Sequence, residues 1–250
     1  MTISGMAYYT IISELLDRVA RGQAAEVAAA ADLISEAVRG GGVLHAFGSG
    51  HSEALAMELA GRAGGLVPSN RLALRDIVLF GGEPASVLSD PGLEHDASVA
   101  RRLYELAPVK QGDVFVIASH SGVNGVVVEL ASLVKERGHG LIAVTSLEHT
   151  RGVPARHPSG RRLSEIADVV LDNGGPYGDA VLPLPAGGSA CAVSSVTGAV
   201  LAQMIIAEVT RRLLDAGEEP PIYLSANVPG GGEHNSQLEA RYVGRIRRGA

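Results

Sequence analysis

Apolar residues along this chain follow two different patterns. Short continuous runs, rich in Val, Ile, Leu and Phe, occupy residues 43–47, 114–118, 141–144 and 166–171. Runs of this kind predict strands with both faces covered, as in a parallel sheet. Between the runs, apolar residues recur three and four positions apart, which predicts amphipathic helices. Strands that alternate with helices indicate an α/β protein.

The predicted helices share this spacing, and most of them end at a glycine or proline. They cover residues 8–22, 24–39, 52–63, 96–107, 126–137 and 194–216. Residues 66–68 and 77–80 are short candidate strands or loop segments. We therefore expect a three-layer αβα sandwich around a mostly parallel five-stranded sheet. The whole chain, 1–250, is predicted to form one domain, with leading helices in 1–40, the α/β core in 41–217 and a C-terminal extension in 218–250.

A glycine-rich loop joins the first strand to its helix, with the sequence Gly48-Ser49-Gly50-His51-Ser52. Backbone N–H groups, the serine hydroxyls and the positive end of the following helix all favour an anion, and phosphate above all. Two nucleotide-binding motifs fit poorly. A dinucleotide fingerprint needs a third glycine where this chain has Glu53, and the Gly-Lys-Ser/Thr of a P-loop occurs nowhere.

A second loop has the same character. The run 114–118 ends in Ser119-His120-Ser121-Gly122-Val123-Asn124, just before the helical stretch 126–137. In open α/β sheets, ligands bind at the carboxyl ends of the parallel strands, where both loops are expected to open. The two loops therefore predict one serine-lined pocket for a phosphorylated ligand.

This pair of loops resembles the phosphate-binding loops of the SIS (sugar isomerase) domain, found in phosphoheptose isomerase, glucosamine-6-phosphate synthase and N-acetylmuramic acid 6-phosphate etherase. The resemblance implies a phosphorylated sugar as ligand, no cofactor, and a homodimer or homotetramer. It also places ligand-binding hydroxyls at Thr145 and Ser146. The residues expected to hold the phosphate are Ser49, Gly50, Ser52, Ser119, His120, Ser121 and Asn124.

Glu58 is the candidate general base. It lies on the helix after the first loop among alanines and leucines, where partial burial would raise the pKa of a carboxyl group toward the range useful for proton transfer. The segment Glu58-Leu59-Ala60-Gly61-Arg62 is similar to the Glu-Leu-Thr-Gly-Arg segment of phosphoheptose isomerase, which contains the catalytic glutamate. Here the glutamate is about one helical turn closer to the loop. The alternative is a solvated or salt-bridged helix residue.

Three histidine or amide side chains complete the predicted site. His51 is a candidate for acid catalysis of sugar-ring opening. The helix over 194–216 lacks the histidine that phosphoheptose isomerase carries there, so His234 and Asn235 are expected to reach a pocket, in the same chain or across a dimer. The alternative is a mobile tail. No His-x-x-x-His pair or His-Glu-x-x-His motif is present, and no metal site is expected.

The favoured activity is aldose–ketose isomerisation of a sugar phosphate, with Glu58 moving the proton. The same base could instead expel a lactyl ether, which makes an etherase of the muramic acid 6-phosphate type a close rival. A phosphosugar sensor without chemistry is the third possibility, although the two leading helices show no basic DNA-recognition face.

The amino-acid composition limits the classes of molecule that this chain is expected to bind. The chain has a net charge of −6, 4% aromatic residues and no Trp, which argues against a nucleic-acid binder. Its single cysteine, Cys191, excludes an internal disulfide. No apolar run is long enough to cross a bilayer, and no leader pattern is present at the N-terminus, so we expect a cytoplasmic protein that does not engage membranes.

Overall fold

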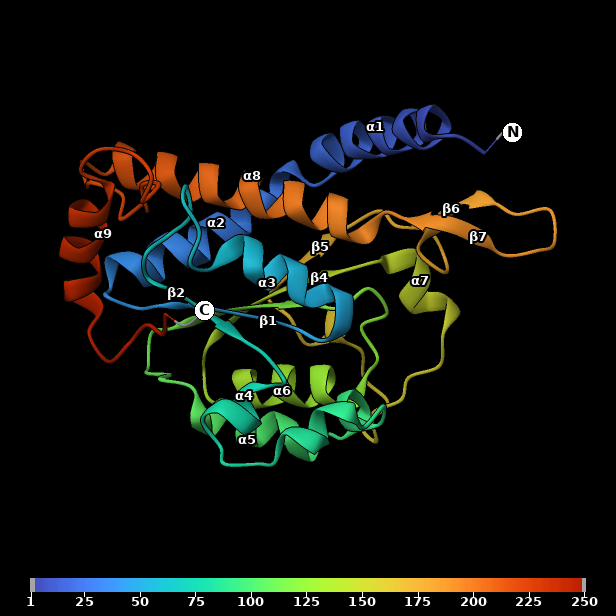
Figure 1. Cartoon of the computed structure of the whole chain (residues 1–250), viewed down its shortest axis with the longest axis horizontal. Helices are drawn as coiled ribbons and strands as arrows, with labels where there is room; N and C mark the ends of the chain where they lie inside the picture. Colours follow the sequence, from blue (N-terminus) through green and yellow to red (C-terminus); the bar gives the residue numbers. More distant parts are fainter. Residues whose placement is uncertain (1–2, 249–250) are drawn as a thin grey trace.

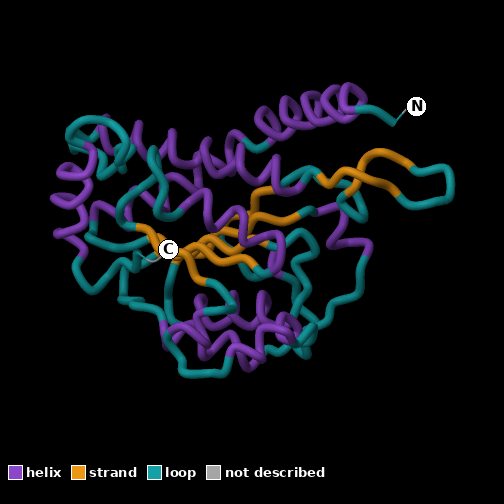
Figure 2. The backbone as a smooth tube through the Cα atoms, in the orientation of Figure 1, coloured by secondary structure: helices purple, strands orange, loops and turns teal. Residues whose placement is uncertain are grey.

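The sheet at the centre of the molecule has five parallel strands. The computed structural model describes residues 3–248, and the strand order is β2-β1-β3-β4-β5 (Figures 1 and 2). The strands are β1 (Leu44–Gly48), β2 (Ser69–Leu72), β3 (Val114–Ala118), β4 (Gly140–Thr145) and β5 (Val169–Asp172). In the register, Gly48 at the end of β1 lies beside Ala118 at the end of β3. The loops that follow these two strands therefore open side by side.

Helices cover both faces of the sheet, which confirms the predicted three-layer sandwich (Figure 1). One layer contains α2 (Ala24–Arg39), α3 (Glu53–Leu59) and α8 (Ser194–Asp215), with α1 (Gly5–Gly22) packed outside them. The other layer contains α4 (Asp76–Leu79), α5 (Ser98–Leu106) and α6 (Gly125–Glu136). Successive strand side chains pack against opposite helix layers: Val116 packs with the first layer and Phe115 with the second.

Several elements differ from the expected ones. Helix α3 ends at Leu59 instead of residue 63, because Ala60 is extended and Gly61 has φ +75°. Of the two candidate segments, 66–68 lies just before the observed strand β2, whereas most of 77–80 is in helix α4. An antiparallel hairpin, β6 (Ala180–Pro183) and β7 (Ser189–Ala192), was not predicted and projects from the sheet beside α7 (Leu147–Gly152) (Figure 1).

The C-terminal extension is packed against the body of the molecule. It contains α9 (Gly231–Glu239), and Tyr223 and Leu238 are buried together with Val67. Arg245 then donates to the buried carboxylate of Asp113 at the amino end of β3. The described part of this extension is therefore integral to the core instead of being a mobile tail. Across residues 3–248, no helix has the length and apolar character needed to cross a membrane.

Candidate functional site

The first wall of the candidate site is the β1–α3 loop. Gly48 is required there, since a Cβ atom at this position would lie 2.3 Å from the carbonyl oxygen of Ser52. Gly50 has φ +55°, in the left-handed region that glycine adopts without strain. The tight 3-10 turn over Gly50–Ser52 directs His51 and Ser52 onto the cavity wall, and Leu55 of α3 follows them.

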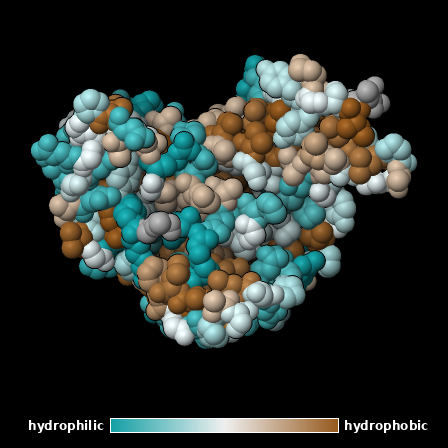
Figure 3. All heavy atoms as spheres, viewed as in Figure 1, coloured by the Kyte–Doolittle hydropathy of each residue, from teal (hydrophilic) through white to brown (hydrophobic). Residues whose placement is uncertain are grey.

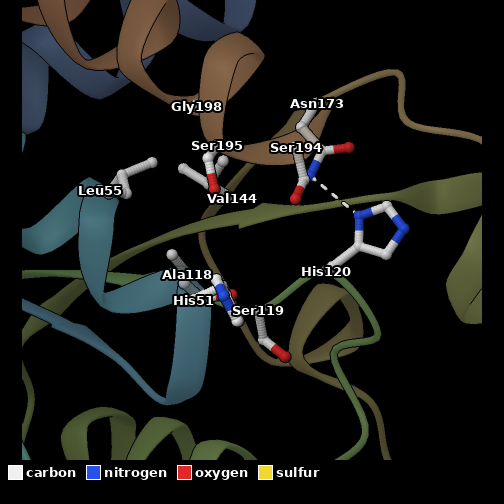
Figure 4. Close-up of a pocket in the computed structure, with 11 residues that line it drawn as sticks. His51, Leu55, Ala118, Ser119, His120, Val144, Asn173, Ser194, Ser195 and Gly198 are labelled. Atoms are coloured by element: carbon white, nitrogen blue, oxygen red, sulfur yellow. Dashed lines mark hydrogen bonds between the residues drawn. The ribbon is translucent and has the colours of Figure 1, made fainter. Parts of the chain in front are cut away.

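The second wall is the β3–α6 loop. Ser119 Oγ accepts a hydrogen bond from the backbone N–H of Gly122 at 3.1 Å. Gly122 has φ +63°, so the loop turns back on itself at this residue. Because the Ser119 oxygen is already an acceptor, its hydroxyl hydrogen remains able to donate to a ligand. Ser119 lies beside His51 at the ends of β1 and β3, where both residues line the cavity (Figure 4).

The third wall comes from the start of α8, which the sequence did not identify as part of a site. Ser194 and Ser195 line the cavity from this helix terminus, and Gly198 lets α8 approach Leu55 of α3 (Figure 4). Asp179 caps the terminus, since its carboxylate accepts from Ser194 N at 2.9 Å and from Ser194 Oγ at 2.7 Å. In the sequence, the Ser194-Ser195 pair at the start of the longest helix was the one feature that could have indicated this third wall.

His120 lies on the wall in a fixed orientation. Its Nδ1 is 3.4 Å from the side-chain nitrogen of Asn173, and its Nε2 is 3.3 Å from the carbonyl oxygen of Pro176. Asn173 Oδ1 accepts from Gly175 N, which requires the amide nitrogen to face the histidine. This amide orientation and the Pro176 carbonyl hold the His120 ring in place, and the Asp179 carboxylate lies 3.9 Å from its Nδ1.

A second histidine packs behind His120. The rings of His149 and His120 have centroids 4.7 Å apart, and Tyr177 lies on the other side of His149. Burial, with a further contribution from the neighbouring His120, lowers the pKa of His149. His149 Nδ1 accepts from the N–H of Gly178 at 3.0 Å, consistent with a neutral ring. His149 thus favours the neutral form near pH 7.

The cavity enclosed by these walls is small, about 20 Å³. That is room for about one water molecule. The hollow can therefore seat only one end of a ligand, while the remainder lies above the carboxyl edge of the sheet. Hydroxyl donors at this end favour an anionic group, whereas the positive end of the 22-residue helix α8 already faces the Asp179 carboxylate.

The other predicted phosphate ligands lie close by but not on the cavity wall. Ser49, Gly50 and Ser121 belong to the same two loops without lining the hollow. Asn124 is the N-cap residue of α6, and its Oδ1 accepts from Arg156 at 3.4 Å.

Thr145 and Ser146, expected to bind ligand hydroxyls, are fully buried instead. Thr145 Oγ1 donates to the carbonyl of His120, and Ser146 Oγ donates to the carbonyl of Gly175 at 2.6 Å. Both hydroxyls are used to hold the site loops in place. They lie one layer below the cavity because the end of β4 is covered by these loops.

Glu58 does not reach the cavity within one chain. It lies one helical turn beyond Leu55, and its carboxylate accepts from Arg62 and from Gln203 Nε2 of α8, the latter at 3.0 Å. The side chain is 29% exposed. Glu58 therefore links α3 to α8 at the outer surface, as the salt-bridged alternative supposed.

His234 and Asn235 are also distant from the cavity. His234 Nε2 is 3.0 Å from the carbonyl oxygen of Ile222, and Asn235 bonds both the N–H and the carbonyl of Leu224. Both residues fasten α9 to the preceding strand-like segment. A role across a dimer stays a prediction. Within residues 3–248, no three His, Cys, Asp or Glu side chains are grouped in a way that could hold a metal ion.

Comparison with known families identifies one match. Residues 7–146 match the model of the SIS domain. The matched region begins in α1 and ends just after β4, so it includes both site loops.

Relatives are found over nearly the full length. A UPF0309 protein of Listeria monocytogenes is 37% identical over 246 residues, which cover 97% of this chain and 98% of the relative. A UPF0309 protein of Geobacillus kaustophilus is 37% identical over 240 residues, 96% of this chain and 94% of the relative.

Solved structures share the fold at low identity. A phosphoheptose isomerase from Neisseria gonorrhoeae has a TM-score of 0.55 and 20% identity, with 82% of this chain and 96% of that chain covered. A phosphoheptose isomerase from Francisella tularensis has a TM-score of 0.56 and 14% identity, with 82% and 95% covered. At these identities the similarity concerns the fold.

Proposed function

The chain belongs to the SIS domain family, and from this premise we propose that it binds a phosphorylated sugar with the phosphate at the cavity between the β1–α3 and β3–α6 loops. The observation that carries the proposal is the convergence of hydroxyl groups from three separate segments. Ser52, Ser119 and Ser195 all line one hollow at the carboxyl edge of the sheet. Ligands of open α/β sheets bind at this edge.

The walls suit an oxygen of a phosphate group and leave the rest of the phosphate and the sugar outside. The three hydroxyls can each donate one hydrogen bond to phosphate oxygens. Because the hollow has a volume of only about 20 Å³, the sugar would extend above it, toward His51. His51 is exposed, so it can move to meet a ligand.

For the reaction, we keep aldose–ketose isomerisation with Glu58 as the base as the leading hypothesis, and the lyase and sensor alternatives remain open. Glu58 lies beside an apolar surface of α8 that includes Val200 and Met204 (Figure 3). A second copy of the chain over this surface, as the predicted homodimer requires, would bring its own residues to Glu58. Isomerisation would then depend on the assembled dimer.

The binding proposal is tested by calorimetry and thermal unfolding of the full chain with sugar phosphates and the matching unphosphorylated sugars. We expect one or more sugar phosphates to bind and the sugars alone to have no effect. The variant Ser119→Ala should weaken binding about tenfold, the equivalent of one charge-assisted hydrogen bond. Ser236→Ala is the matched control, since that hydroxyl is exposed on α9 and donates to Gly232.

The same samples distinguish chemistry from sensing. Incorporation of solvent deuterium beside the carbonyl of a bound sugar phosphate, followed by NMR, supports the isomerase hypothesis. Release of lactate from a muramic acid 6-phosphate supports the etherase. Binding without either supports the sensor, and an absence of any phosphate-dependent binding would refute the site.

A further inference from the structure

A second cavity opens at the β2 edge of the sheet and is lined by five arginine side chains. We call it the arginine cavity; its guanidinium groups belong to Arg62, Arg71, Arg75, Arg247 and Arg248. Its volume is about 340 Å³, within the size range of small-molecule sites. The chain as a whole has a net charge of −6 and only 21 Lys and Arg residues. Almost a quarter of them therefore face one cavity.

The arginines reach the cavity from separate elements. Arg62 follows α3, Arg71 is on β2, Arg75 precedes α4, and the last two come from the C-terminal segment. Figure 1 shows the C-terminal end of the chain between α3 and α4, where these elements meet. Residues distant in sequence are thus held around one space by the folded core.

Carboxylates in the neighbourhood neutralise most, but not all, of the positive charge of the cavity. Asp76 is the one acidic residue on its lining. Burial raises the pKa of Asp76, while the positive charges of Arg247, Arg75 and Arg71 act in the opposite direction. Three glutamates pair with the arginines from outside the lining, namely Glu53, Glu58 and Glu239. Even with these included, five guanidinium groups face four carboxylates.

Two of the arginines are positioned mainly by neutral groups. Arg247 donates to the carbonyl of Leu106 and lies over the Phe80 ring at 4.0 Å from its centroid. Its Nη1 is buried without a hydrogen-bond partner among the described residues. Arg248 donates to the carbonyl of Ser69 at 2.8 Å. The positive charge of Arg247 is consequently available to a ligand, whereas Arg248 also pairs with Glu239. Both side chains are already ordered, which lowers the entropic penalty of binding.

One side of the cavity is apolar. Met57, Leu79 and Phe80 line it, and each is more than half exposed. In Figure 3 brown atoms gather below the C-terminal end, in the region of α4. Large apolar side chains beside guanidinium groups suit a ligand that has a charged end and an apolar or ring-shaped end.

We propose that the arginine cavity binds an organic diphosphate, a small molecule with two linked phosphate groups attached to an apolar or ring-shaped body. Guanidinium groups bind phosphate oxygens with paired hydrogen bonds, and five of them exceed what a single phosphate can engage. The three outer glutamates hold four of these arginines in ion pairs and leave an excess of one positive charge, so a diphosphate would bind by replacing part of those pairs. The apolar wall takes the remainder of the ligand.

This site is separate from the phosphosugar cavity and does not depend on it. The hollow between the two loops is lined by the beginning of α3, whereas the arginine cavity is lined by the end of that helix and by Arg62 beyond it. The proposed phosphosugar function could therefore fail while the arginine cavity binds its ligand, and the reverse is equally possible.

The test is calorimetric titration of the full chain with inorganic pyrophosphate, adenosine diphosphate and adenosine monophosphate. We expect adenosine diphosphate to bind with one-to-one stoichiometry, at least tenfold more tightly than the monophosphate and more tightly than pyrophosphate. The double variant Arg71→Gln, Arg75→Gln should lose at least tenfold in affinity. Arg71→Lys, which keeps the charge but not the planar fork, should lose less.

Arg39→Gln is the matched control, since Arg39 is an exposed arginine paired with Glu218 at 2.7 Å outside the cavity. It should leave the affinity unchanged, and Ser119→Ala should also leave it unchanged. The proposal is overturned if no probe binds, if the double variant binds as the wild type does, or if Arg39→Gln weakens binding as much. Loss of binding in Ser119→Ala would place the probe in the other cavity and overturn it as well.

Discussion

The replacement Asp113→Asn should strongly destabilise the fold, because the Asp113 carboxylate is a buried acceptor for four donors. Oδ1 accepts from Val43 N at 2.9 Å and from Arg245 Nη2 at 2.6 Å. Oδ2 accepts from Lys110 N at 2.7 Å and from His45 Nε2 at 3.0 Å. The side chains of Asp113 and His45 are both fully buried. This cluster joins β1, β3 and the C-terminal segment.

The magnitude follows from the geometry. An asparagine has one oxygen, so its NH₂ group must face two of the four donors, whichever way it turns. Each buried donor left unpaired costs about 1–3 kcal/mol, and removing one partner of a buried ion pair costs about 3–5 kcal/mol in all. We therefore expect the free energy of unfolding to fall by about 3–5 kcal/mol at pH 7, as measured by guanidinium denaturation followed by circular dichroism.

The same carboxylate predicts a dependence on pH. Burial raises its pKa, but the hydrogen bonds from His45, from Lys110 N and from Arg245 outweigh burial and lower the pKa from 3.8 to about 2. A carboxyl whose pKa is depressed in the folded state stabilises the protein above the unfolded pKa. That contribution, about 2 kcal/mol, is present above pH 4 and is lost as the pH falls through 2. The difference between wild type and Asp113→Asn should shrink over this range.

The control for this experiment is Asp17→Asn, which breaks an exposed pair with Arg21 on α1. It should change the free energy of unfolding by less than about 0.5 kcal/mol. A loss below about 1 kcal/mol in Asp113→Asn would refute the four-donor account. His45 does not add a charge of its own, because burial lowers the pKa of its imidazole.

Three further predictions concern the site and the C-terminal segment. Gly48→Ala should abolish sugar-phosphate binding in calorimetry, since its Cβ would collide with the Ser52 carbonyl, whereas Gly22→Ala, with nothing within 4 Å, should bind normally. If Glu58 is the base, Glu58→Gln should reduce deuterium exchange into substrate by about 10²-fold or more without changing the unfolding midpoint by more than a few degrees, and an unchanged rate would remove Glu58 from the mechanism. Truncation after Tyr242 should lower the unfolding midpoint, because it removes the arginine partner of the Asp113 carboxylate; an unaltered midpoint would show that the C-terminal contacts contribute nothing.

Local patterns were sufficient to predict the elements of the core. The run 114–118 became β3 with all five residues buried, and the spacing of apolar residues in 24–39 matched α2. The hairpin β6–β7 was not predicted for two reasons. Prolines at 183 and 185 are unfavourable in strands, and three of the four residues of β7 are exposed, so the segment shows no apolar run. Its pairing is a local interaction with little burial, so hydrophobicity carries almost no signal for it.

The sequence by itself determined the three-layer α/β architecture and the two glycine-serine loops. Strands buried on both faces appear as continuous apolar runs, and tight turns require glycine, so both features can be recognised from neighbouring residues. Only the tertiary structure decided which side chains share a cavity. Asn173 and Ser195 line the cavity although the sequence did not predict it. Thr145, Ser146 and Glu58, which were predicted there, form hydrogen bonds elsewhere. The arginine cavity likewise joins residues up to 186 positions apart, from Arg62 to Arg248. Such convergence depends on how strands and helices pack, a long-range property that no local pattern records.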